Sequence, residues 1–291
     1  MISRFTDLTP VSQDYLDAIL MGDKSIAHQI VLNAIQSGML PMDAYIEILV
    51  PAQSRIGELW LNGDLSIANE HMATEITTLE MELLRGLAIR KPSINRRILI
   101  STAPGERHSL GARIVSDFLY INGWDVDFIG SDIPADELGR FASERKPDVI
   151  ALSVVLPENS LHAKDAIEII RKHTPQTPIM IGGPGINGEE HVKKLGGDGY
   201  AADAPSAIRI ARELAGIGKA ENLDQVLSEL GIRIQSARRA MNWNQQDLAE
   251  SSGMDRTYIS ALENGRQNLT IGALVKIANA LDVPTSSLLP D

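Results

Sequence analysis

Cysteine is absent from this chain of 291 residues, so neither a disulfide framework nor a thiolate metal site can form. Aromatic residues make up only 4% of the sequence, and there is no uninterrupted apolar run of about 18 residues that would predict a membrane-spanning helix. Acidic residues are spread from Met1 to Gly22, which is not typical of a signal peptide. These absences predict a cytoplasmic protein that is not attached to a membrane.

Basic residues are in the minority, because 27 Lys and Arg face 38 Asp and Glu and the formal net charge is −11. This balance argues against nucleic acid covering the whole surface, but it allows one neutral or locally basic DNA-binding face. The length and a hydrophobic content of 44% predict two or three domains with sizeable cores. No Ser-His-Asp set, Walker loop or metal-ligand spacing is found, so we do not expect an enzyme.

The first 92 residues are expected to be helical. Apolar residues recur there at helical spacing, and Gly22-Asp23, Gly38–Pro41 and Asn62–Asp64 separate them with residues that favour turns. Ser66 is a suitable N-cap for the last of these helices. Four helices joined by short turns predict an antiparallel four-helix bundle over residues 1–92.

From residue 96 onward, strand-like runs alternate with helical ones, which is typical of parallel βαβ units. We expect strands near residues 97–101, 125–129, 148–153 and 178–181, with a weaker fifth at 199–200. The region 96–216 is therefore predicted to be an α/β domain with a parallel sheet, Rossmann-like and more narrowly flavodoxin-like. An apolar stripe then predicts a linker helix over 217–230, formed by Leu223, Val226, Leu227 and Leu230.

Polar and small residues stand directly after three of the expected strands, where open α/β sheets bind their ligands. The sets are Glu106, His108, Ser109 and Gly111 after the first strand, Ser153 and Val155 after the third, and Gly182 and Gly183 after the fourth. Together they resemble the cobalamin-binding fingerprint Asp-x-His-x-x-Gly, Ser-x-Leu, Gly-Gly. The resemblance implies that these eight positions contact cobalamin.

For the first set, the resemblance implies that the His108 imidazole is the lower ligand of the cobalt ion. Glu106 would accept the other ring N–H and fix the tautomer of His108. Gly111 would let the backbone approach the corrin. The sequence departs from the fingerprint at Glu106, where the family has Asp, so that this bond would come from a longer side chain.

For the other two sets, the resemblance implies contacts with the nucleotide tail of the cofactor. The Ser153 hydroxyl would bind this tail, and the missing side chains of Gly182 and Gly183 would leave a slot for it. Val155 replaces the Leu of the family pattern, which is a mild apolar change.

Residues 231–291 resemble the helix-turn-helix of phage repressors of the Cro and C1 type. Ala249 is small enough for two helices to cross closely, and Gly253 suits the turn between them. The resemblance implies an all-helical domain whose second helix enters the major groove of double-stranded DNA. The expected DNA contacts are Gln245, Gln246, Arg256, Thr257, Ser260, Arg266 and Asn268. Basic and acidic residues balance in this region, so a small helical interaction domain stays an alternative.

Trp60 and the pair Glu70-His71 lie in the predicted bundle, on either side of a short turn. They resemble the cap of the light-sensing adenosylcobalamin regulators of carotenoid synthesis, which carries Trp and then Glu-His at this spacing. The resemblance implies that Trp60 covers the adenosyl group, while Glu70 and His71 contact its ribose or adenine. Those regulators have an amino-terminal DNA-binding domain of the MerR type, whereas this chain has a carboxyl-terminal one.

A second departure is at Leu61, the residue after Trp60. Several of these regulators have a His at this position, and that His ligates cobalt after light removes the adenosyl group. The Leu61 side chain cannot ligate cobalt. After illumination, the upper cobalt ligand would be either water or His71.

The combined resemblance implies a multidomain transcriptional regulator whose oligomerisation and operator binding change when light cleaves the Co–C bond of adenosylcobalamin. A homo-oligomer, dimer or tetramer, is expected on the operator. Two alternatives stay open: a corrinoid protein that carries methyl groups for a methyltransferase, and a regulator that senses cobalamin or another tetrapyrrole without light.

Overall fold

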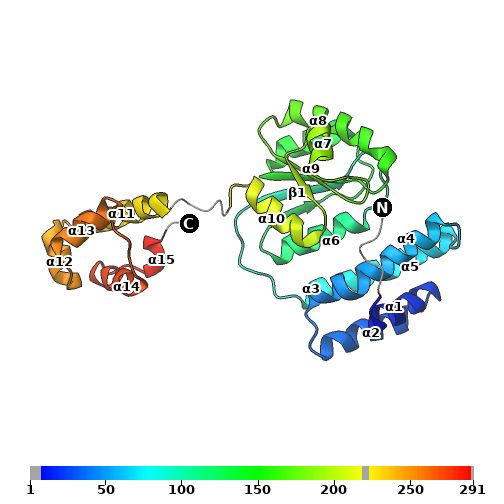
Figure 1. Cartoon of the computed structure of the whole chain (residues 1–291), viewed down its shortest axis with the longest axis horizontal. Coiled ribbons are helices and arrows are strands. Elements are labelled where there is room, and N and C mark those ends of the chain that lie inside the picture. Colours follow the sequence, from blue (N-terminus) through cyan, green and yellow to red (C-terminus); the bar gives the residue numbers. More distant parts are fainter. Residues whose placement is uncertain (1–7, 218–222, 290–291) are drawn as a thin grey trace. The chain divides into compact units, whose positions relative to one another are not determined.

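The computed structural model describes residues 8–217 and 223–289, and it shows two compact units, residues 1–217 and 218–291 (Figure 1). The first unit contains a helical bundle and an α/β domain, and the second is helical. This confirms the predicted fold class. No helix in the described ranges combines the length and the apolar character that a membrane crossing requires.

The bundle consists of four helical segments, as predicted from the spacing of its apolar residues. They are α1 (Pro10–Leu20), α2 (Lys24–Gln36), the continuous run of α3 (Pro41–Ala44), η1 (Tyr45–Leu49) and α4 (Val50–Leu61), and α5 (Ile67–Leu87). Ser66 is the N-cap of α5, since its side chain accepts a hydrogen bond from the Asn69 N–H. The π-helical turn η1 was not predicted. It directly precedes Pro51, which has no N–H to donate and whose ring crowds the preceding turn.

The α/β domain has a five-stranded parallel sheet in the order β2-β1-β3-β4-β5. Its strands are β1 (Arg97–Thr102), β2 (Asp125–Phe128), β3 (Val149–Ser153), β4 (Ile179–Gly182) and β5 (Gly199–Ala201), close to the predicted positions. The chain leaves β1 toward β2 on one side and then returns to β3 on the other. The carboxyl ends of β1 and β3 are therefore the topological switch point, where such sheets bind ligands.

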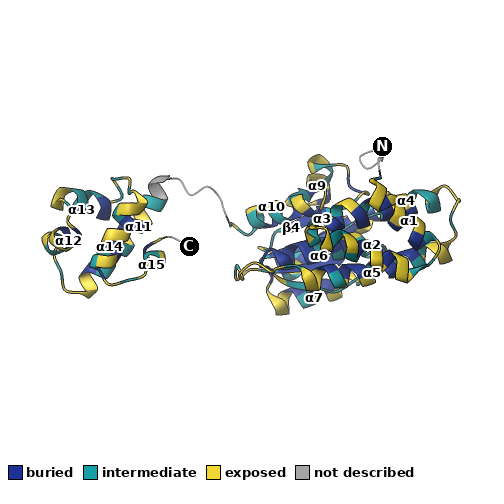
Figure 2. Ribbon diagram, turned by 90° about the horizontal axis from the view of Figure 1, so that it is seen from below, coloured by how far each residue is buried: buried dark blue, intermediate teal, exposed yellow. Residues whose placement is uncertain are grey.

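Helices cover both faces of the sheet (Figure 1). One face packs against α6 (Leu110–Ile121) and α10 (Ala204–Leu214), and the other against α7 (Ala135–Arg145), α8 (Ser160–His173) and α9 (Glu189–Leu195). A short 3-10 turn, η2 (Pro157–Asn159), precedes α8. Figure 2 shows the sheet and the inward helix faces as buried.

The bundle and the α/β domain share one hydrophobic core. Ile114 and Phe118 of α6 and Ala204 at the start of α10 are buried in the same cluster as the bundle residues. Burial of one large apolar side chain contributes roughly 1.5–3 kcal/mol. This shared core fixes the bundle on the α6–α10 face and brings the turn between α4 and α5 to the carboxyl end of β1.

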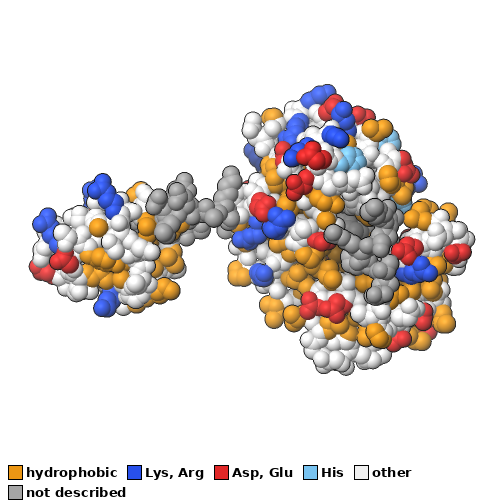
Figure 3. Space-filling view, in the orientation of Figure 1, with side chains coloured by type: hydrophobic (Ala, Val, Ile, Leu, Met, Phe, Trp, Pro, Cys, Tyr) orange, Lys and Arg blue, Asp and Glu red, His pale blue; other side chains and the backbone are white. Residues whose placement is uncertain are grey.

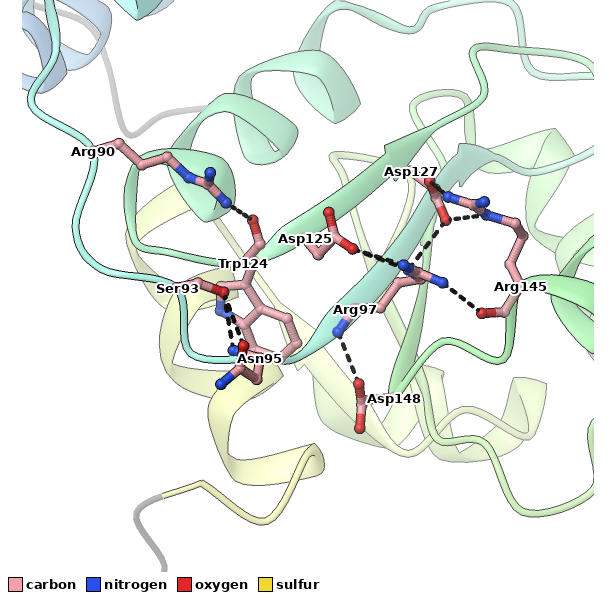
Figure 4. A network of polar contacts seen from close by, with 9 residues as sticks. All are labelled: Arg90, Ser93, Asn95, Arg97, Trp124, Asp125, Asp127, Arg145 and Asp148. Carbon is pink, nitrogen blue, oxygen red and sulfur yellow. Dashed lines mark hydrogen bonds and ion pairs between the residues drawn. The ribbon is translucent and has the colours of Figure 1, made fainter. Parts of the chain in front are cut away.

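Charged residues link the amino ends of the strands, away from the switch point (Figure 4). Arg97 binds Asp125 at 2.8 Å, and its backbone N–H donates to Asp148 at 2.8 Å. Arg145 forms a two-pronged pair with Asp127, with distances of 2.8 and 2.6 Å. Several of these side chains are well exposed, so each pair contributes at most about 1 kcal/mol. We infer that this network helps to align the strands.

The second unit consists of α11 (Leu223–Ala240), α12 (Gln245–Ser252), α13 (Arg256–Glu263), α14 (Ile271–Ala280) and α15 (Thr285–Leu288). The predicted linker helix lies partly outside the described residues, which exclude 218–222 and the side chains of 223–225. From Leu223, α11 continues without a break past residue 231, and Leu230 packs into the core of this unit with Ile234. Gly253 takes the turn between α12 and α13 with φ +66°, as expected.

Candidate functional site

The loop between β1 and α6 is organised around one buried carboxylate. Glu106 is fully buried, and its Oε1 accepts hydrogen bonds from the His108 backbone N–H at 3.0 Å and from His108 Nδ1 at 2.5 Å. Its Oε2 accepts from the N–H groups of Val155 and Leu156 at 2.9 and 2.8 Å, and from Asn159 Nδ2 at 3.0 Å. Glu106 thus ties the loop after β1 to the loop after β3.

These contacts set the charge state of Glu106. Burial alone raises the pKa of this carboxyl, but the hydrogen bonds from His108, Leu156 and Asn159 outweigh it and lower the pKa to about 2. An ionised carboxylate only accepts hydrogen bonds, so Nδ1 of His108 must carry the proton. The hydrogen bond to Glu106 also raises the pKa of His108 against the effect of burial, with a smaller contribution from the charge of Glu70. Nε2 of His108 is left as the nitrogen that can ligate a metal.

The bundle places Trp60 against this imidazole. Trp60 lies in the last turn of α4, and its ring centroid is 5.9 Å from that of His108, with the planes tilted by 50°. Glu70 is in the first turn of α5 with a side chain 21% exposed, and its Oε2 is 3.4 Å from Nε2 of His71. The His71 side chain is 74% exposed. The structure therefore brings Trp60, Glu70 and His108 to one site, with His71 on its solvent side.

The glycines predicted at the site differ in their surroundings. Gly111 is exposed in the first turn of α6, and a Cβ built there meets no atom within 4 Å, which leaves room for a close ligand. A Cβ on Gly182 would lie 2.4 Å from the Ala201 carbonyl oxygen, and one on Gly183, with φ +102°, would lie 2.3 Å from that of Val154. A side chain at either position would therefore collide with neighbouring backbone, and the contact of this pair with the nucleotide tail stays a prediction. The pair permits close packing of the chain at the end of β4.

The strand register brings the fingerprint residues together. Ser153 pairs with Thr102 of β1 and with Gly182 of β4. Ser109 is the N-cap of α6, but its side chain makes no capping hydrogen bond. Both residues are partly exposed at the carboxyl end of the sheet, where their hydroxyl groups can meet a ligand.

Three residues of this site were not predicted from the sequence. Asn159 is buried and donates to Glu106, as described above. Thr102 donates its hydroxyl to the Glu106 carbonyl oxygen at 2.6 Å and accepts from the Asp132 N–H at 3.2 Å. Asp132 in turn accepts from the Gly105 N–H at 2.9 Å. Their positions at the end of β1 and after β2 and β3 were the signal available, since ligand loops follow these strand ends.

In the second unit, the predicted recognition helix α13 exposes its first turn. Asp255 caps this helix and binds the Thr257 N–H at 2.7 Å, and Arg256 and Thr257 are exposed. Ser260 is partly exposed one turn later, and Arg266 is exposed after the helix end. This arrangement leaves these side chains accessible to a ligand of the size of a DNA duplex.

The two glutamines that begin α12 have partners within the protein. Gln245 donates to Glu263 Oε2 at 2.9 Å, and Gln246 donates to Glu250 at 2.8 Å. The buried Glu263 also accepts two hydrogen bonds from Arg238, at 2.6 and 2.8 Å. Gln245 therefore supports the packing of α12 against α13, and its contact with DNA stays a prediction.

On the face drawn in Figure 3, the described basic residues of this unit do not form one continuous patch. Figure 3 shows Lys and Arg side chains at separate points on the visible face. Of the described basic residues in this unit, Arg238 is buried in the ion pair with Glu263. Asn268 is exposed beyond α13, as the predicted backbone contact requires. Recognition of DNA by this unit would therefore depend on a few individual side-chain contacts and not on a broad basic surface.

Three family models match the chain. Residues 11–85 and 96–209 match two models described as B12 binding domain, and residues 234–288 match a helix-turn-helix model. The chain is 26% identical over 164 residues to the HTH-type transcriptional repressor CarH of Myxococcus xanthus. That match covers 56% of this chain and 54% of the relative, so the chain spans about half of its length.

Corrinoid proteins are similar to the first unit. The chain is 28% identical over 209 residues to the dimethylamine corrinoid protein 2 of Methanosarcina acetivorans, covering 69% of this chain and 94% of that protein. The monomethylamine corrinoid protein of Methanosarcina barkeri superposes with a TM-score of 0.62 at 20% identity, over 70% of this chain and 98% of that one, and so supports the fold alone. The chain therefore joins two B12 binding domains, its bundle and its α/β domain, to a carboxyl-terminal helix-turn-helix domain.

Proposed function

We propose that this protein is a transcriptional regulator that binds cobalamin at the carboxyl end of its sheet and adjusts DNA binding by its helix-turn-helix. The observation that carries this proposal is the His108 imidazole, held through Nδ1 by buried Glu106 and covered by Trp60, in one chain with a DNA-binding type of domain. A regulator has use for both parts, whereas a catalyst has no need of the second.

The donor set suits a metal that arrives with most of its own ligands. His108 offers one nitrogen, Nε2, which would hold a cobalt ion whose other ligands come with the corrin ring. Gly111 has open space beside it, and Ser109 and Ser153 offer hydroxyl groups at the same edge of the sheet. In this proposal His108 is the lower ligand, while Glu106 holds its tautomer and orientation.

The finer part of the proposal concerns the upper ligand. When bound, adenosylcobalamin supplies a weak cobalt–carbon bond that light breaks, which releases the adenosyl group. Trp60 would shelter this group with its indole, and Glu70 and His71 would contact the nucleoside. Once these contacts are lost, the bundle no longer favours the dark conformation, and the equilibrium of the protein shifts accordingly. Leu61, with a 59% exposed isobutyl side chain, cannot take the vacated position on cobalt.

The output would be operator binding by a homo-oligomer, a dimer or a tetramer. Arg256, Thr257 and Ser260 on α13 would face base edges in the major groove of double-stranded DNA. Arg266 and Asn268 would contact the phosphate backbone. Basic and acidic residues balance over residues 231–291, so the charge of this region adds little to DNA affinity, and two copies on a two-fold site would supply the affinity that one copy lacks.

The main alternative is a corrinoid protein that carries methyl groups. It is favoured by the similarity to a dimethylamine corrinoid protein over 94% of that protein's length. The helix-turn-helix favours the regulator, because a methyl carrier gains nothing from it. A regulator that senses cobalamin without light would share every residue of the proposed site, and the light arm of the experiment separates it.

The proposal is tested by loading the purified protein with adenosylcobalamin in darkness. Binding to DNA from upstream of its own gene is then titrated at fixed salt for apo, dark and illuminated samples, and the oligomeric state is measured in parallel. We expect cobalamin to change affinity by about 5- to 150-fold, the usual range for coupled sites. Equal affinity and size in the three samples would refute the regulator, and a change by cobalamin but not by light would leave the light-independent sensor.

A further inference from the structure

A line of polar side chains leads from the cofactor side of the bundle into its core. Glu70 Oε1 accepts a hydrogen bond from the Thr74 hydroxyl at 2.9 Å, one turn further along α5. The Thr74 hydroxyl also lies 3.4 Å from Oε1 of Gln53, on α4. Three side chains on two helices thus meet directly behind the carboxylate that faces the site.

Gln53 has a fixed orientation. Its amide nitrogen donates to the Ala73 carbonyl oxygen at 3.1 Å and to the Thr77 hydroxyl at 2.6 Å, so both of its N–H bonds are in use. Thr77 is fully buried and bonds the hydroxyl of Tyr15, also fully buried, at 3.0 Å. Because the amide nitrogen is held on this side, Oε1 of Gln53 must point toward Thr74.

The Thr74 hydroxyl has a single proton and two acceptors in reach. The shorter contact, 2.9 Å against 3.4 Å, assigns this proton to Glu70. Gln53 Oε1 lies on the other side of this hydroxyl as the weaker of its two acceptors, so the Thr74 side chain stays between Glu70 and Gln53. Glu70 is also in the first turn of α5, where the helix dipole favours a negative charge.

A carboxylate held in this way is suited to a sugar. Carboxylates in nucleotide-binding folds accept hydrogen bonds from ribose hydroxyl groups, and a fixed carboxylate does so without loss of side-chain entropy. Glu70 is near enough to His108 for its charge to act on that imidazole, and Trp60 lies against the same ring. Glu70 is therefore on the side of the site where an upper ligand of cobalt would lie.

We propose that Thr74, kept in place by Gln53, is a positioning residue that holds the Glu70 carboxylate to accept hydrogen bonds from the vicinal hydroxyl groups of a nucleoside. The Thr74–Gln53 pair thereby sets selectivity for a nucleoside over a methyl upper ligand. This inference rests on the proposed cobalamin function and deepens it, but it does not depend on DNA binding.

The test compares affinities for adenosylcobalamin and methylcobalamin in darkness. Thr74→Val keeps the shape of the side chain and removes the hydroxyl, while Thr74→Ser keeps the hydroxyl. Thr78→Val is the matched control, because Thr78 donates only to the Thr74 backbone carbonyl, at 2.9 Å. We expect Thr74→Val to weaken adenosylcobalamin binding about 3- to 10-fold, the effect of one hydrogen bond, with methylcobalamin binding unchanged. Thr74→Ser and Thr78→Val should both keep the wild-type ratio of affinities.

The double variant Glu70→Gln with Thr74→Val checks that Thr74 acts through Glu70. In that background we expect Thr74→Val to have no further effect on the ratio. Thermal unfolding of the apo variants shows whether the bundle stays folded. An equal loss for both cobalamins in Thr74→Val would show a merely structural role and overturn the inference, as would an unchanged ratio.

The affinities of the wild-type protein show whether the inference about Thr74 fails alone or together with the proposed function. If wild type prefers adenosylcobalamin and Thr74→Val keeps that preference, the inference is wrong and the adenosyl site stands. If wild type binds both forms equally, the proposed adenosyl site and the inference fail together.

Discussion

Replacement of Glu106 by Gln keeps the shape of the side chain but replaces one acceptor oxygen with an NH2 group, which can only donate hydrogen bonds. Glu106 accepts from five donors, two on His108 and three from the loop after β3. An amide has one oxygen, so its NH2 group must face donors on one side or the other. If the oxygen keeps the bonds to Val155, Leu156 and Asn159, His108 has to move its proton to Nε2 to accept from the amide. The nitrogen expected to ligate cobalt is then blocked.

The size of the effect follows from the pKa of Glu106. A fall from the ordinary value of 4.5 to about 2 corresponds to about 3 kcal/mol of stabilisation of the charged form in the folded protein. We expect Glu106→Gln to lose about that much of its free energy of unfolding as apo protein at neutral pH. We further expect cobalamin affinity to fall about 10- to 100-fold, as for other groups that orient a metal-ligating His.

The assay combines chemical denaturation of the apo protein with titration of cobalamin followed by its visible spectrum. Glu168→Gln is the matched control, because Glu168 is an exposed acid on α8, the helix that follows the loop after β3. His108→Ala should lose the spectrum of the His-ligated cofactor whatever the stability. A Glu106→Gln variant with wild-type stability, affinity and spectrum would refute this account of the site.

Three further predictions concern other parts of the chain. Trp60→Ala should weaken adenosylcobalamin binding more than methylcobalamin binding in dark titrations, since the indole would cover only the larger ligand; equal losses would count against that role. Arg256→Ala should weaken operator binding by about 1–3 kcal/mol in gel-shift titrations, with Lys276→Ala on α14 as control, and an intact affinity would remove Arg256 from the interface. Burial raises the pKa of Glu263, but the hydrogen bonds from Arg238 and Gln245 outweigh burial and lower this pKa. The ionised Glu263 therefore stabilises the folded protein above the ordinary pKa of 4.5, and this stabilisation is lost as pH falls through the lowered pKa. Hydrogen exchange in α11 and α13 between pH 7 and pH 3 should show this loss in wild type but not in Glu263→Gln, and identical pH profiles would contradict it.

Much of the α/β domain could be predicted because its signals are local. Strand residues such as Ile98–Ile100 are apolar without a break, and the loop residues after them stand next to strand ends in the sequence. Parallel pairing then brings Ser153 beside Thr102 and Gly182, so residues of the fingerprint lie together at one edge of the sheet. The helical period of the bundle likewise predicted its segments.

The remaining features depend on contacts between distant segments. In the sequence nothing distinguishes Asn159 from other polar residues. Its hydrogen bond to Glu106, at 3.0 Å, forms only because the fold brings the two loops together. The space beside Gly183 depends on the position of Val154, in another strand connection. Gln245 has the sequence position of a DNA contact, yet its bond to Glu263 arises from the packing of α12 against α13. Pro51 could have indicated the π-helical turn that precedes it. The helical spacing of the apolar residues predicted a regular helix there instead.

The core shared by the bundle with α6 and α10 bears on how such proteins can be recombined. The two B12 binding domain matches divide residues 11–85 from 96–209, yet Ile114, Phe118 and Ala204 complete the interior of the bundle. A gene fusion or an engineered chimera cut near residue 92 would expose apolar surface on both fragments and yield two insoluble halves. A sensor taken from this chain for a new output domain has to be transferred whole, as residues 1–217.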